Sequence, residues 1–119
     1  MTHHTKPVVL SATSINGDNV KNADGEHLGH IEELMIDLGT GKVAYVVLSF
    51  GGFLGMGNKL FAIPWAAFTL DAENKEFVLN VSQEKLENAP GFDKNNWPDM
   101  TSREWGSEIY DYYEHQPHW

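Results

Sequence analysis

The sequence contains no cysteine, and its 8 Lys and Arg residues are outnumbered by 17 Asp and Glu residues. Without Cys, disulfide cross-links and thiol chemistry are excluded, which is typical of a protein from a reducing compartment, and we expect the cytoplasm. The net charge of −9 repels a nucleic-acid backbone, because phosphate binding depends on Lys and Arg side chains. Direct nucleic-acid binding is therefore not expected.

Long hydrophobic runs are also missing. No stretch approaches the roughly 18 consecutive apolar residues that a membrane-spanning helix requires, and residues 1–7 lack the apolar segment of a signal peptide. We therefore expect no membrane span and a flexible N-terminus over residues 1–7. The length of 119 residues is enough for one domain with a single hydrophobic core.

The stretch from Asp24 to Phe50 predicts a β-hairpin. Asp24-Gly25 is a turn signal, and Gly39-Thr40-Gly41 is a second turn followed by the β-branched and aromatic run Val43 to Phe50. A turn this short returns only an antiparallel partner strand. Ile31 and Leu34 change phase within the first arm, which indicates a bulge near Glu32-Glu33.

Shorter strands are expected on both sides of this hairpin. The pattern places them at 8–10, around Val20-Lys21, at 59–63, at 68–70 and at 77–81, and Asn16-Gly17 is a typical hairpin turn. Ser82 is positioned to cap a short helix through Glu87. The predicted fold is mainly β: a small closed or partly open antiparallel β-barrel of about six strands over residues 8–90.

Residues 91–119 form an aromatic, acidic extension with one predicted helix. Thr101 and Glu104 have the spacing of a capping box, and the helix is expected to end near His115. Its apolar face comprises Trp105, Ile109, Tyr112 and Tyr113. The strand over 43–50 is apolar on both faces, whereas a barrel covers only its inner face. We expect the helix to cover the outer face, a second subunit to cover it, or both.

The order of turns in this chain resembles the PRC-barrel domain family. The resemblance is carried by Asp24-Gly25, Leu28-Gly29-His30-Ile31, Ile36-Asp37 before Thr40-Gly41-Lys42-Val43, Gly51-Gly52 and Ile63-Pro64. It covers roughly residues 10–89. The family includes the cytoplasmic barrel of the photosynthetic reaction-centre H subunit and a domain of a ribosome-maturation factor. The resemblance implies a small β-barrel without known catalytic residues.

Motifs for catalysis or for binding cofactors are weak. The glycines of residues 51–57 lack the spacing of a phosphate-binding loop, and a strand is expected after them where such a loop requires a helix. The chain has no Gly-x-Ser-x-Gly element. His27 and His30 point to opposite faces of an extended strand, and His115 and His118 flank a proline, so neither pair makes a convincing zinc site. We expect no enzyme activity, no metal and no cofactor.

The sequence therefore predicts a non-catalytic protein-interaction module that associates with itself or with another protein. Two groups of residues are the predicted contacts: Phe53, Leu54 and Met56 in the glycine-rich loop, and Trp105, Ile109, Tyr112 and Tyr113 on the C-terminal helix. Two alternatives remain open at this point. One is a protein-binding role similar to that of the ribosome-maturation factor, and the other is a barrel that binds a small ligand or a metal.

Overall fold

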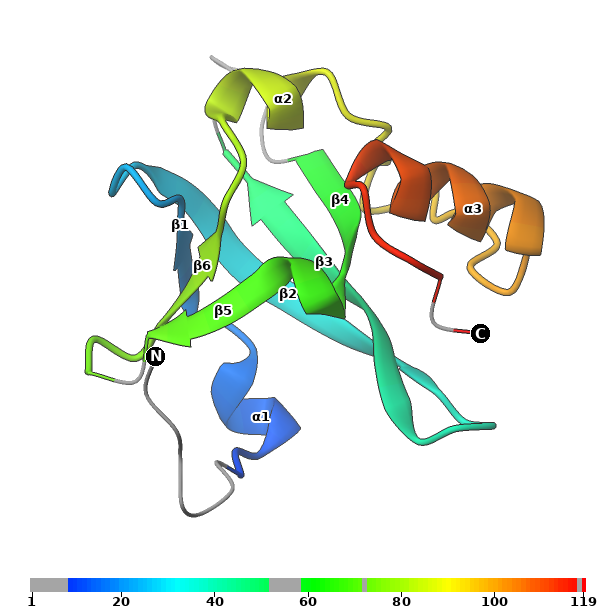
Figure 1. The fold of residues 1–119 in the computed structure, drawn as a ribbon, viewed down its shortest axis with the longest axis horizontal. Coiled ribbons are helices and arrows are strands. Elements are labelled where there is room, and N and C mark those ends of the chain that lie inside the picture. The colour runs from blue at the N-terminus through cyan, green and yellow to red at the C-terminus, as the bar shows by residue number, and fades with distance from the viewer. Residues whose placement is uncertain (1–8, 52–58, 72, 118) are drawn as a thin grey trace.

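The computed structural model describes residues 9–51, 59–71, 73–117 and 119. In these residues the chain forms one strongly curved six-stranded sheet with the strand order β4-β3-β2-β1-β6-β5 (Figure 1). The strands are β1 (Asn19–Lys21), β2 (His27–Asp37), β3 (Lys42–Phe50), β4 (Lys59–Pro64), β5 (Phe68–Asp71) and β6 (Glu76–Leu79). The helical segments are α1 (Ala12–Ile15), η1 (Trp65–Ala67), α2 (Gln83–Glu87) and α3 (Arg103–Tyr112). The predicted six-stranded, mainly β fold with a C-terminal helix is confirmed in its partly open form, a half-barrel.

The central hairpin has the predicted form. β2 and β3 are antiparallel, and the turn between them is closed by the Asp37 carboxylate, which accepts the Gly39 N–H at 2.8 Å. The register shifts between Ile31 and Glu33, so the bulge lies where the sequence places it, and a second shift follows between Met35 and Ile36. Figure 1 shows the tip of this hairpin projecting beyond the other strands. We call the projecting part, residues 34–44, the arm.

The N-terminal part differs from the prediction. Val9 and Leu10 are not in a strand, and Val8 lies outside the described residues. The Ser11 hydroxyl accepts the Ser14 N–H at 3.1 Å and begins the short helix α1, because Ser side chains satisfy free N–H groups at helix starts. Asn16-Gly17 does not close a hairpin either: Gly17 donates its N–H to the Ile31 carbonyl at 2.7 Å.

Four of the five strand pairings in the described sheet are antiparallel as expected, and the fifth is parallel, which the prediction did not include. β1 pairs with β6 in parallel, with Val20 opposite Phe77. Lys21 on β1 lies 3.1 Å from the Asp71 carboxylate and 3.3 Å from that of Glu76, so one ammonium group links three strands at this end of the sheet. These strands are distant in sequence, and no local turn signal reports such a pairing.

The two helices after the barrel begin with serine caps. The Ser82 hydroxyl accepts the Lys85 N–H at 3.0 Å, which confirms the predicted start of α2. The cap of α3 is Ser102 and not Thr101, because it is the Ser102 hydroxyl that accepts the Trp105 N–H. The Thr101 hydroxyl instead donates to the Asp99 carboxylate at 2.5 Å, which removes it from the capping position. No helix in the described part of the chain is long and apolar enough to cross a membrane.

Gly29 allows β2 and β3 to approach each other closely. Its φ is +153°, and a Cβ atom at this position would lie 2.0 Å from the Ser49 carbonyl oxygen. We predict that Gly29→Ala lowers the free energy of unfolding by about 2–5 kcal/mol, because backbone strain and overpacking add. The measurement is urea denaturation followed by circular dichroism.

Gly17→Ala is the matched control, because Gly17 also has a positive φ of +90° but nothing lies within 4 Å of its would-be Cβ. This variant should lose only about 1–2 kcal/mol, the cost of the backbone conformation. Equal losses for the two variants would mean that the Ser49 carbonyl moves aside at little cost.

Candidate interaction surface

The outer face of β3 is covered by the chain's own C-terminal helix. Tyr45 on β3 is 1% exposed, and its ring lies 5.2 Å from that of Trp105 and 5.5 Å from that of Tyr110 between centroids. The Tyr110 hydroxyl donates a hydrogen bond to the Ala44 carbonyl at 2.7 Å. These three rings and one buried hydrogen bond fix α3 on the barrel.

Gly106 allows this close packing. A Cβ atom there would lie 2.6 Å from the Tyr45 hydroxyl and 2.8 Å from the Trp119 ring. Trp119 closes over the helix from the end of the chain: its ring lies 6.1 Å from that of Tyr110, and the Arg103 guanidinium lies 5.8 Å from its centre. At the other end of the helix, the Tyr112 hydroxyl donates to the Lys85 carbonyl of α2.

The predicted contact residues on α3 are used inside the chain. Ile109 and Tyr113 are buried, and Trp105 and Tyr112 are half-buried against the same core. Tyr110 belongs to this face as well and was missed, because the i, i+4, i+7, i+8 pattern does not include it. Phe53, Leu54 and Met56, the other predicted contacts, lie outside the described residues.

Among the described histidines, His27, His30 and His115 are not brought together as a metal site. The His30 imidazole lies 3.6 Å from the Glu32 carboxylate, and both side chains are substantially exposed. In the part of the chain that the structure describes, no three His, Cys, Asp or Glu side chains are placed to hold a metal ion. His118 lies outside that part, so the spacing of His115 and His118 is not tested.

Exposed apolar side chains gather around the arm. Of the seven large apolar side chains that are exposed among the described residues, six line two hollows that lie beside the arm and share Ile36. One hollow, of about 400 Å³, lies between the arm and the N-terminal segment, and the other, of about 520 Å³, lies between the arm and the start of α3. We call these six residues the arm surface: Val9, Leu10, Ile36, Leu38, Trp65 and Trp119. This surface was not predicted from the sequence, because the alternation of apolar and polar residues does not show that a hairpin extends past the neighbouring strands.

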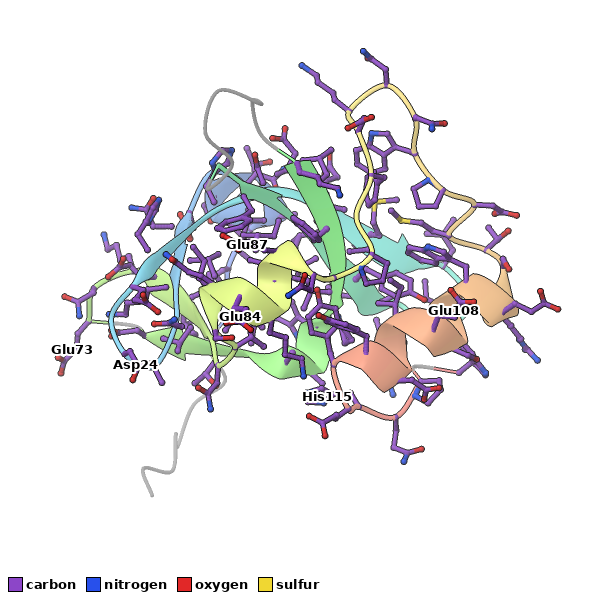
Figure 2. The ribbon with its side chains drawn as sticks, turned by 90° about the horizontal axis from the view of Figure 1, so that it is seen from above. Asp24, Glu73, Glu84, Glu87, Glu108 and His115 are labelled. Carbon is purple, nitrogen blue, oxygen red and sulfur yellow. The ribbon has the colours of Figure 1, made fainter. Side chains whose placement is uncertain are left out.

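Few charged side chains line the two hollows. Asp37 and Arg103, one of each sign, are the charged residues among those that line the two hollows. Figure 2 labels five acidic side chains, which come from α2, from α3 and from the β1–β2 and β5–β6 turns. They are Asp24, Glu73, Glu84, Glu87 and Glu108. The two charges that line the hollows therefore balance, in a protein whose net charge is −9.

Comparison with known protein families gives one match. A family model described as PRC-barrel domain matches residues 7–86, which include all six strands and most of α2. The match ends before α3 begins. A comparison with curated proteins found no match.

The hydroxyls of Tyr110 and Tyr113 provide a matched test of how α3 is held. Both are buried, but only that of Tyr110 has a hydrogen-bond partner, and that of Tyr113 has none in the described structure. We predict that Tyr110→Phe lowers the free energy of unfolding by about 1–2 kcal/mol, whereas Tyr113→Phe is neutral or stabilising. Chemical denaturation of both variants against the parent chain measures this. A larger loss for Tyr113→Phe would contradict the hydrogen-bonding described here.

The same helix makes the protein sensitive to alkali. Burial raises the pKa of Tyr45 and of Tyr110 from 10 to about 12, with the neighbouring Tyr110 adding to the effect at Tyr45. Between pH 10 and 12 the unfolded chain loses these protons while the folded chain keeps them. The free energy of unfolding should therefore fall across this range by about 2 kcal/mol for each tyrosine.

Urea denaturation midpoints measured from pH 9 to pH 12 test this prediction, with phenolate absorbance as a second signal. Tyr110→Phe should be less stable than the parent at pH 9 but should lose less stability as the pH rises. Parallel pH profiles for the two proteins would mean that Tyr110 ionises as freely in the folded as in the unfolded state.

Proposed function

Because the chain belongs to the PRC-barrel domain family, we propose that it is a non-catalytic protein-interaction module that associates with a second copy of itself through the arm surface. The observation that carries the proposal is the gathering of six of the seven exposed large apolar side chains around the arm. Exposed apolar side chains gathered in this way mark an interaction site in a folded domain. We place this association in the cytoplasm, since nothing in a Cys-free chain depends on an oxidising compartment.

The required contact area is within reach of this surface. A stable interface buries about 800 Å² on each partner. The described chain exposes 7789 Å², so an interface of that size takes about a tenth of it. The arm, the N-terminal segment and the end of α3 together offer apolar groups on several elements, which is the composition of an interface core.

Electrostatics allows two acidic copies to meet at this surface. Two chains of charge −9 repel each other over distances up to about the Debye length, roughly 8–10 Å at physiological salt. None of the five acidic residues labelled in Figure 2 lines either hollow. Because one charge of each sign lines the two hollows beside the arm, contact there brings few like charges together.

The contact is expected to involve side chains and not added strands. β2 beyond Ile31 has no partner strand on its β1 side in the described structure, so its backbone edge is open there. The edge is nevertheless protected by two register shifts and by exposed Glu32 and Glu33, and the Glu33 carboxylate accepts the Leu34 N–H at 3.3 Å. Bulges and charged side chains are the devices that block pairing of strand edges.

Light scattering coupled to size exclusion measures the proposed association directly. We expect a mass of two or more chains for the parent protein, and a single-chain mass for Leu38→Asp, because this change puts a charge on the most exposed apolar side chain of the arm, which is 92% exposed. The cost of burying an unpaired carboxylate is several kcal/mol.

Thr40→Asp is the control for this experiment. It places the same charge two residues away in the same exposed turn and should leave the mass unchanged. A parent protein that is still monomeric at about 100 µM would overturn the proposed self-association, because its dissociation constant would then be weaker than that of typical specific contacts. Loss of association in both variants would assign the effect to charge and not to Leu38.

A further inference from the structure

The hollow between the arm and α3 has two unlike walls. One wall is the end of the arm and carries Leu38 and the Asp37 carboxylate. The other wall is formed by the start of α3, which carries Arg103, and by the ring of Trp119. The hollow has a volume of about 520 Å³, which is large enough for apolar side chains from another molecule.

Each wall presents an apolar group that its own chain leaves uncovered. Leu38 is 92% exposed and Trp119 is 44% exposed. Leu38 occupies a hairpin turn, where polar residues and glycine are usual. Trp119 is packed through one part of its ring on Gly106 and Tyr110, and the remainder faces the hollow.

The charges on the two walls are opposite. Arg103 is the first residue of α3 and forms no ion pair within the described residues; its guanidinium lies against the Trp119 ring. A positive charge at a helix N-terminus is disfavoured by the helix dipole. Arg103 is therefore at a position that local helix energetics does not favour, and sites of this kind are where a binding role is expected.

A second copy of the chain fits this hollow better than an unrelated apolar surface. When two identical surfaces meet across a two-fold axis, each residue of one copy faces a different residue of the other, and the same contact occurs twice. When the axis runs along the hollow, between its two walls, an arm wall lies against a helix wall on both sides of the axis. Leucine then meets tryptophan, and carboxylate meets guanidinium, in both halves of the interface.

Resting on the proposed self-association, we infer that two copies meet across a two-fold axis at this hollow, with Asp37 of each copy facing Arg103 of the other and Leu38 lying against the other copy's Trp119. An Arg and carboxylate pair is suited to this role because its planar, directional hydrogen bonds define orientation. The apolar contact supplies the affinity, and the two charge pairs select the register.

Exchange of the two charges tests the arrangement. In Asp37→Arg both walls are basic, and in Arg103→Asp both walls are acidic, so each variant alone opposes like charges twice in the dimer. We expect each to weaken self-association by about 100-fold or more. Mixed in equal amounts, the two variants form a heterodimer in which both pairs are restored, with an affinity within about 10-fold of the parent.

Light scattering gives the mass of each variant and of the mixture, and native mass spectrometry identifies the heterodimer, because the two variants differ in mass. The controls are Glu73→Arg and Lys94→Asp, which reverse one exposed charge of each sign away from the hollow. They should associate as the parent does, alone and mixed. Unfolding midpoints for all four variants verify that each protein is folded.

The outcomes separate this inference from the proposal on which it rests. A monomeric parent removes the self-association and this arrangement together. A dimeric parent whose two exchange variants also remain dimeric leaves self-association standing and rejects the Asp37 to Arg103 contact. Variants that separate but do not combine when mixed also reject it, because their defect would then not be one of complementary charge.

Discussion

The burial of β3 on both of its faces is the constraint on which this structure depends. A half-barrel provides a core for one face of a strand only, yet Tyr45, Val46, Val47 and Leu48 are each 1% exposed or less. The second face is covered by α3, and the cover is fixed by the ring contacts of Tyr45 and by one buried hydrogen bond to the backbone of β3. The C-terminal extension is therefore part of the hydrophobic core, although the family match ends at residue 86.

α3 covers only part of the outer face of the β2–β3 hairpin, and the arm surface lies beyond the part that it covers. α3 spans residues 103–112, about 15 Å of helix, and it lies beside the end of β3 that also pairs with β4. The register between β3 and β4 begins at Tyr45, so the arm beyond it has neither a neighbouring β4 residue nor the full helix against it. The apolar side chains of Ile36 and Leu38 are consequently left exposed, on a hairpin whose base is paired with β4. The same geometry that completes the core produces the surface proposed for association.

The parts of this fold that depend on local signals were predictable, and those that depend on distant pairings were not. The Asp37 to Lys42 turn, the bulge after Ile31 and the Ser82 cap follow from short-range chemistry that the sequence displays directly. The parallel contact of β1 with β6 joins residues more than 50 positions apart and has no local marker. The start of α3 was misassigned by one residue because Thr101 and Ser102 are both good caps, and only the competing hydrogen bond to Asp99 decides between them. For the candidate surface, the sequence identified an aromatic helix that needs a partner but could not show that the partner is the chain's own β3.

The charges that line the two hollows favour association there over association through an acidic surface. A strongly acidic protein that buried acidic groups on self-association would be opposed by both Coulomb repulsion and desolvation. Here one carboxylate and one guanidinium line the two hollows beside the arm, and none of the acidic side chains labelled in Figure 2 lines them. Salt screens the long-range repulsion between the net charges of the two copies more effectively than it screens a partly buried pair at a contact. Association through the arm surface should accordingly persist or strengthen as ionic strength rises, whereas binding of a basic partner to the exposed acidic side chains would weaken. This difference in sign distinguishes the two kinds of interaction in one titration.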